Sequence, residues 1–381
     1  MVPKTTRETN DTTVSSKLYL ALELSNTEWK LGFTIGLGQP PRLRTLPARD
    51  LSGLKQEIDQ AKERFGLDES AEVYSCYEAG RDGFWLHRFL EASQVNNVVV
   101  DSASIEVNRR FRRAKTDRLD VGKLLTMLVR YHQGESKVWS VVHVPSVAEE
   151  DQRQLHRELM ALKREQTHHI NRSKGILASQ GVLLEVQADY LENLRLAKLW
   201  DGSPLPLGVQ TLLVREHKRL ELVREQIRQI EATRRETLRT SSDPAIEQMR
   251  RLLRLKGIGI NSAWVYVMEF FSWRAFHNRR EVGSLAGLTP TPYQSGDSAR
   301  ERGISKAGNR AVRALAIEIA WAWLRNQPQS QLSCWYQRRF AKGSSRVRRI
   351  GIVALARKLL VALWRYLEYD ILPESAQLKS A

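Results

Sequence analysis

Apolar and polar positions alternate in the N-terminal third of the chain in a way that predicts strands interleaved with helices. Residues 18–37 are typical of two strands joined by the polar turn Ser25-Asn26-Thr27. The segments that follow alternate between helical and strand-like spacing, with a helix at 51–66, a strand at 71–79, a helix at 82–93 and a strand at 96–103. We therefore predict an α/β domain with a central sheet over residues 17–146, after a disordered N-terminus of residues 1–16.

From about residue 147 the apolar positions narrow to stripes within a heavily charged sequence. The stripes keep helical spacing and lie on either side of a Pro- and Gly-containing linker, the first at Leu155, Leu159, Leu162 and Ile170, the second at Leu213, Leu220, Ile227 and Ile230. This pattern is typical of a coiled-coil arm over residues 147–242, and two amphipathic helices packed on the body of the protein fit it equally well. Asp243-Pro244 is typical of a helix start, so we predict an all-α domain over 243–370 and a tail over 371–381.

Charge indicates the kind of partner. The chain has 60 Lys and Arg against 43 Asp and Glu, a net charge of +17, which favours polyanionic partners. Charged residues interrupt every apolar run before it reaches the roughly 18 residues of a membrane span, so we expect nucleic acid and no membrane. The two cysteines, Cys76 and Cys334, exclude a disulfide scaffold and a zinc finger and suit a reducing cytoplasm.

Four acidic residues stand out by their position in the predicted elements. Glu23 lies in the apolar first strand and Glu78 ends the strand at 71–79, while Asp117 and Asp120 are three residues apart, on one face of a helix. Strand ends and a nearby helix start can converge on one cleft, where carboxylates would bind Mg²⁺ or Mn²⁺ for phosphodiester chemistry. A solvated helix face explains the Asp pair as well, but an unpaired acid buried in a strand would be costly.

Basic residues cluster in two segments. The first cluster surrounds Phe111 just before the Asp pair and comprises Arg109, Arg110, Arg112, Arg113 and Lys115. The second lies in KGSSRVRR and includes Arg346, Arg348 and Arg349. Either cluster can be a solvated loop, but beside a candidate phosphodiester site we interpret the first as a clamp on a nucleic-acid backbone, and the second as a further backbone contact.

The segments around these acids resemble a known family. The order of a strand acid, YEAG (77–80) and KTDRLD (115–120), followed by SLAGLTPTPYQSG (284–296) and ISKAGNRAVR (304–313), is similar to the IS110 family of insertion-sequence transposases. The resemblance implies an RNase H-like (RuvC-like) N-terminal domain whose Asp-Glu-Asp-Asp tetrad corresponds to Glu23, Glu78, Asp117 and Asp120. The first acid of the family is usually Asp, so Glu23 is a departure that would affect metal geometry and activity.

The resemblance also implies a mechanism and partners. The family is expected to recombine donor and target DNA under the guidance of a non-coding bridge RNA, as a homo-oligomer, a dimer or tetramer, in the bacterial cytoplasm at the nucleoid. Its nucleophilic serine corresponds to Ser295, which we expect in an exposed loop and which would form a phosphoserine intermediate; Ser298 and Ser305 are the alternatives. Three readings stay open at this point: this recombinase, a metal-dependent nuclease or resolvase that uses water, and a catalytically decayed nucleic-acid-binding protein.

Glycines at 253–266 are typical of a helix-hairpin-helix. In LRLKGIGINSAWVY, Lys256, Gly257 and Gly259 would let backbone amides approach a DNA phosphate. A close helix–helix turn without a ligand gives the same pattern. Lys306, in the family-like segment ISKAGN, is a further candidate for nucleic-acid contact.

Overall fold

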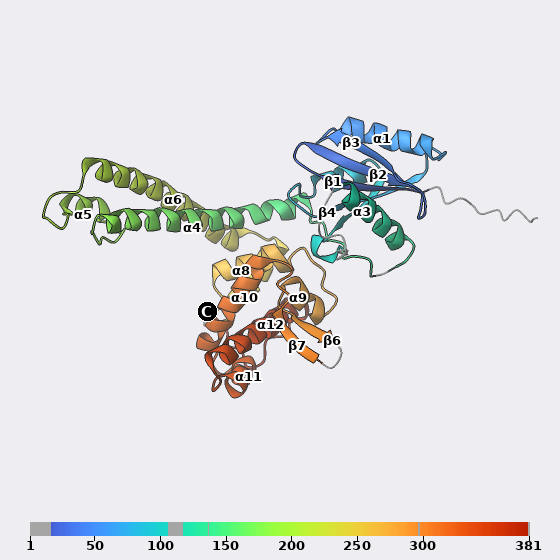
Figure 1. Ribbon diagram of the computed structural model, residues 1–381. Helices are drawn as coiled ribbons and strands as arrows, with labels where there is room; N and C mark the ends of the chain where they lie inside the picture. The colour runs from blue at the N-terminus through green and yellow to red at the C-terminus, as the bar shows by residue number, and fades with distance from the viewer. Residues whose placement is uncertain (1–16, 106–116, 136, 296–297, 380–381) are drawn as a thin grey trace, which may run out of the picture. The chain divides into compact units, whose positions relative to one another are not determined.

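The computed structural model describes residues 17–105, 117–135, 137–295 and 298–379 (Figure 1). Its contacts divide the chain into two compact units, residues 1–144 and 145–381. Within the described residues, none of the helices combines the length and the apolar character that crossing a bilayer requires.

The first unit is built on a five-stranded sheet in the order β3-β2-β1-β4-β5. Its strands are β1 (Lys17–Leu24), β2 (Glu28–Thr34), β3 (Arg42–Pro47), β4 (Glu72–Glu78) and β5 (Val95–Val100). β1, β2 and β3 pair antiparallel, whereas β1, β4 and β5 pair parallel. The mixed α/β class predicted for this part of the chain is confirmed, and β3 is an edge strand that the sequence pattern did not predict.

Helices cover both faces of this sheet. Alternate residues of β1 point to opposite faces, so Leu18, Leu20 and Leu22 pack under α1 (Leu51–Arg64) and α2 (Trp85–Ala92). Tyr19 and Ala21 face the other way and pack with α3 (Asp117–His132). The sheet is therefore buried on both sides, which explains why β1 is a continuous apolar run.

The second unit begins with two long helices, α4 (Val147–Ser179) and α6 (Leu207–Thr240), which lie side by side with the short α5 (Tyr190–Leu196) near their far end (Figure 1). A capping box closes the start of α4: the Ser146 hydroxyl accepts from the Glu149 amide while the Glu149 carboxylate accepts from the Ser146 amide. The two apolar stripes of the sequence meet along the seam, where the side chains Leu159, Leu162, Val223, Ile227 and Ile230 are buried together.

A buried acid lies within this pair of helices. Glu216 is fully buried, and its carboxylate contacts three basic side chains. His169 Nδ1 lies 2.8 Å from Oε2, Arg172 Nη1 lies 3.3 Å from Oε1, and Arg219 also bonds to Oε1. Because a buried charge needs partners, this cluster holds α4 and α6 in one relative register.

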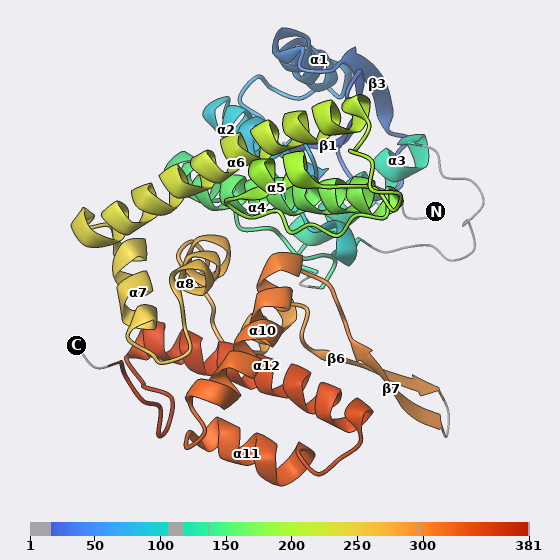
Figure 2. The same cartoon turned by 90° about the vertical axis from the view of Figure 1, so that its left-hand side faces the viewer.

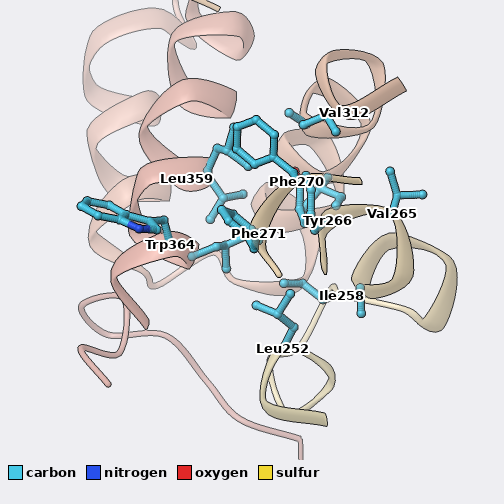
Figure 3. Packing of buried hydrophobic residues seen from close by; sticks show 14 of the residues in the cluster. Leu252, Ile258, Val265, Tyr266, Phe270, Phe271, Val312, Leu359 and Trp364 are labelled. Carbon is cyan, nitrogen blue, oxygen red and sulfur yellow. The ribbon is translucent and has the colours of Figure 1, made fainter. Parts of the chain in front are cut away.

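A helical body with one hairpin completes the second unit (Figure 2). Its elements are α7 (Pro244–Leu253), α8 (Ile260–Tyr266), the π-helical turn η3 (Val267–Phe271), α9 (Arg279–Leu285), β6 (Pro290–Ser295), β7 (Ser298–Ile304), α10 (Arg310–Asn326), α11 (Gln331–Phe340) and α12 (Ser345–Tyr369). Asp243 caps α7 and Pro244 follows at its first position, as the sequence predicts. Figure 3 shows the core of this body, in which Tyr266, Phe270 and Trp364 pack between α8, η3 and α12.

The prediction of an entirely helical C-terminal region is wrong at β6 and β7. These two strands pair antiparallel, with Tyr293 opposite Arg300 and Ser295 opposite Ser298. Pro290, Pro292 and Gly303 are loop-forming residues, so their presence concealed a pair of strands.

The base of the long helices is fixed to the helical body by a charged joint. Arg157 of α4 donates from Nε to Glu269 Oε1 at 2.9 Å and from Nη2 to Oε2 at 3.2 Å, and Glu269 is buried in the π-helical turn. Next to it the guanidinium of Arg234 lies 4.4 Å from the ring centroid of Trp264. His156, one residue before Arg157, is buried, and this burial lowers the pKa of its imidazole to about 4.

Candidate active site

Two of the predicted acids end neighbouring strands of the sheet. β1 and β4 pair in parallel, and the last pair of their register is Leu22 opposite Tyr77. Continuing this register by one residue brings Glu23 beside Glu78, at the spacing of neighbouring strands, about 4.8 Å. Side-chain alternation places both on the face covered by α3, beyond Ala21 of β1. Glu23 is half-buried and Glu78 is exposed, so this edge is open to solvent.

The direction of α3 brings the other two acids toward the same edge. At its end, the His132 ring centroid lies 4.2 Å from that of Tyr74, near the start of β4. In its middle, the Leu124 carbonyl lies 3.9 Å from the Cys76 thiol. The helix therefore runs antiparallel to β4, and its first turn, with Asp117 and Asp120, points toward the end of β4 that carries Glu78. The side chains of this Asp pair lie outside the described residues.

Small residues in the sheet let α3 pack closely. Gly32 of β2 pairs with Ala21 of β1 beneath the helix. A Cβ added at Gly32 would lie 2.5 Å from Val121 Cγ1, so a larger residue would displace the helix. Cys76 is fully buried below α3, and burial raises the pKa of its thiol, which therefore stays protonated and unreactive.

The strand acids fit a divalent cation in chemistry and position. Carboxylate oxygens at a solvent-open sheet edge are the ligands that Mg²⁺ and Mn²⁺ prefer. Among the side chains that the structure describes, no three His, Cys, Asp or Glu residues come together as a metal site. Glu23 and Glu78 alone are thus an incomplete ligand set, and the first turn of α3 carries the acids that would complete it.

The candidate nucleophile lies at the end of the hairpin. Ser295 is the last residue of β6 and pairs with Ser298, the first residue of β7. The expected exposed loop is therefore a strand end, and the two residues between these serines, as well as both serine side chains, lie outside the described part of the chain. Figure 2 shows β6 and β7 projecting from the helical body.

Two interlocked glycines hold the base of the hairpin. Gly287 has a φ of +67°, and a Cβ there would lie 2.0 Å from the Ala307 carbonyl oxygen. Gly308 has a φ of +85°, and a Cβ there would lie 2.0 Å from the Leu285 carbonyl oxygen. The sequence motifs AGLTP and KAGN contain these glycines, but only the fold shows that the two segments pack backbone against backbone.

Backbone hydrogen bonds close the same joint. The Lys306 amide donates to the Gly287 carbonyl at 3.2 Å, and the Ser305 amide donates to Thr289 at 2.8 Å. The side chain of Lys306 is exposed and can reach a ligand. The Ser305 hydroxyl oxygen is buried and has no hydrogen-bond partner among the described residues. Ser295 stays the predicted nucleophile, with Ser298 and Ser305 as the alternatives.

The glycine turn between α7 and α8 packs against other parts of the helical body. Gly257 has a φ of +89°, and a Cβ there would lie 3.3 Å from Asn326 Cβ of α10. Lys256 Nζ donates to Gln377 Oε1 at 3.0 Å, in the C-terminal segment. Gly259 precedes α8 as its N-cap in an extended conformation. The turn therefore has a structural role in joining α7, α10 and the C-terminal segment.

One of the two basic clusters lies at the start of α12. Arg346, Arg348 and Arg349 are exposed on the first turns of α12. Within the described residues, none of these three is within salt-bridge distance of an acid. The other cluster, Arg109, Arg110, Arg112, Arg113 and Lys115, lies outside the described residues.

Comparisons with known proteins agree on one family. A family model described as the transposase IS116/IS110/IS902 family matches residues 249–337. The chain is 39% identical over 376 residues to y4rJ of Sinorhizobium fredii, which carries the name of a transposase, and the match covers 95% of each chain. It is 30% identical over 212 residues to the transposase for insertion sequence element IS1328 of Yersinia enterocolitica, covering 55% of this chain and 60% of that protein.

Proposed function

The chain belongs to the IS116/IS110/IS902 family of insertion-sequence transposases, and we propose that it cuts and rejoins DNA with Ser295 as nucleophile and a carboxylate-bound divalent cation. The observation that carries the metal half of this proposal is the register of β1 and β4. Continued by one residue, this register supports a position of Glu23 beside Glu78, on the face that α3 covers.

Each part of the chain has a role in this proposal. Residues 17–146 form an RNase H-like, RuvC-like domain, a reading compatible with the order β3-β2-β1-β4-β5 and its strand directions. Residues 147–242 form a coiled-coil-like arm, and residues 243–370 carry the serine hairpin. The turn at Lys256, Gly257 and Gly259 is the candidate helix-hairpin-helix for a DNA phosphate.

The chemistry follows from the residue types. Glu23, Glu78, Asp117 and Asp120 would hold Mg²⁺ or Mn²⁺, which, when bound, withdraws charge from the phosphate and favours ionisation of an attacking hydroxyl. The Ser295 oxygen forms a bond to phosphorus as its proton is lost. The bond from phosphorus to one sugar oxygen breaks, and that oxygen takes up a proton. The phosphoserine ester conserves the bond for rejoining to another strand.

The same proposal includes the partners. A net charge of +17 supports binding to donor and target DNA and to a guide RNA. Because strand exchange needs several cut ends held together, we propose a homo-oligomer, a dimer or a tetramer.

Substitution of Ser295 tests the nucleophile. Wild-type protein, purified with its RNA and given Mg²⁺ and labelled DNA, should form a covalent protein–DNA adduct on a denaturing gel. Ser295→Ala should abolish adduct and recombinant product, while Ser298→Ala, at the position paired with it, should retain both.

Other outcomes identify the competing functions. Mg²⁺-dependent cutting without any adduct would show a nuclease that uses water. Salt-sensitive binding without Mg²⁺-dependent cutting would show a catalytically decayed nucleic-acid-binding protein.

A further inference from the structure

A groove with an exposed tryptophan lies between three helices of the helical body. It has a volume of about 460 Å³ and is lined by residues of α10, α11 and α12, including Trp321, Arg325, Tyr336, Gln337, Arg348 and Arg349. Trp321 is 45% exposed although it lies on a helix whose opposite face is in the core. Tyr336 is buried and supports the groove, and its hydroxyl donates to the Arg348 carbonyl at 3.4 Å. The groove therefore has the buried side chain of Tyr336 on one side and the solvent-accessible indole of Trp321 on another.

Basic residues outnumber acidic ones at this groove. Its lining includes Arg325, Arg348 and Arg349 and no Asp or Glu. Residues 319–367 contain ten Lys and Arg and no Asp or Glu, and the acid Glu318 lies one turn before Trp321 on α10. Arg325, Arg348 and Arg349 are exposed, and none is within salt-bridge distance of an acid among the described residues. The first turn of α12 at the groove also lacks an acid, so the positive end of that helix adds to the field. An anionic ligand is favoured here over an apolar segment of a protein.

We propose that this groove binds an unpaired nucleotide of a single-stranded nucleic acid. The base stacks on the indole of Trp321, and the flanking phosphates lie against Arg325, Arg348 and Arg349. An aromatic platform beside free cations is the combination by which proteins hold single strands without reading their sequence. A paired base exposes only its edges in the grooves, so a duplex cannot occupy the indole face in this way.

This site is distinct from the acids of the sheet and from the serine hairpin. The proposal rests on the proposed function only in that nucleic acid is the partner, and its test needs no catalysis. The ligand of this site is an unpaired nucleotide. Opened DNA and the unpaired parts of an RNA both supply such nucleotides, because both have exposed base faces and flanking phosphates.

Binding by the full-length protein to labelled oligonucleotides of about 10 nucleotides, measured by fluorescence anisotropy, tests the stacking. Trp321→Ala should weaken binding of a single strand about 5- to 150-fold, and Trp321→Phe should restore most of it. Replacing the bases by abasic sites should weaken binding by the wild-type protein by a similar factor. The same replacement should change the affinity of the Trp321→Ala variant little. Arg348→Gln should reduce the slope of log affinity against log salt by about 0.7.

Trp200→Ala is the matched control, because Trp200 is 92% exposed but lies outside the groove. It should bind single strands like the wild type. DNA and RNA of one sequence are compared, and Trp321-dependent binding of either supports the site and identifies its strand. Unchanged affinity of Trp321→Ala would overturn the proposal, as would loss of self-association by that variant with single-strand binding intact. The binding assay contains no Mg²⁺ and involves no DNA cleavage, so failure of the serine chemistry and failure of this site are separate results.

Discussion

Gly308→Ala tests whether the interlocked glycines hold the serine hairpin in place. An L-residue in the left-handed conformation of Gly308 costs about 1 kcal/mol. The added Cβ would also overlap the Leu285 carbonyl oxygen, which belongs to backbone and cannot rotate away. Separating the two segments breaks two backbone hydrogen bonds, which the Lys306 amide donates to the Gly287 carbonyl and the Asn309 amide donates to the Leu285 carbonyl, at about 1 kcal/mol each. We expect a total loss of about 3 kcal/mol in the free energy of unfolding.

Gly303→Ala is the matched control for this variant. Gly303 has a φ of +50°, but a Cβ there would meet no atom of the described residues within 4 Å, so we expect only the conformational cost of about 1 kcal/mol. For a unit of this size about 1 kcal/mol lowers Tm by about 2–4 °C, so thermal unfolding should show a loss of about 6–12 °C for Gly308→Ala. Hydrogen exchange should also accelerate in β6 and β7 of that variant. Equal Tm losses for the two variants, or unchanged exchange in the hairpin, would refute the interlock.

Two further predictions concern titration and the metal site. The unfolded imidazole of His156 takes up a proton below about pH 6.5, whereas the folded one resists until about pH 4, so stability should fall across this window by about 3 kcal/mol. His156→Gln should flatten the Tm profile between pH 7 and pH 5, and parallel profiles for both proteins would contradict the assignment. Glu23→Gln should slow Mg²⁺-dependent DNA cleavage roughly 100-fold, the size of losing one electrostatic stabiliser, while Glu23→Asp should retain cleavage in a Mg²⁺ titration. Cleavage by Glu23→Gln at the wild-type rate would exclude a metal-ligand role.

The sequence predicts most of the helices and strands of the first unit. The sheet is buried on both of its faces, so its central strands have an apolar pattern that is easily recognised. β1 and β4 are apolar runs bounded by turn residues, and α1 keeps three buried positions at helical spacing. β3 escapes prediction because Arg42 and Arg44 make an edge strand look like a polar loop. The hairpin of β6 and β7 escapes prediction because Pro290, Pro292 and Gly303 are typical of loops.

The candidate site is predictable in its residue types but not in its geometry. That Glu23 lies beside Glu78 follows from parallel pairing between strands far apart in the sequence, which local periodicity does not encode. The groove at Trp321 depends on three helices meeting, and along the sequence Trp321 is only one more apolar residue of a helix.

The buried carboxylate of Glu216 determines the mechanical character of the long helices. A slide of α6 by one turn along α4 would move Glu216 about 5.4 Å away from His169 and Arg172 and leave this buried carboxylate with only Arg219 of its own helix among its present basic partners. The paired helices α4 and α6 therefore resist sliding along each other, and we expect them to move as one rigid element. At 33 residues, α4 spans about 50 Å, so a load applied at the distal end is transmitted to the Arg157–Glu269 joint rather than absorbed along the way.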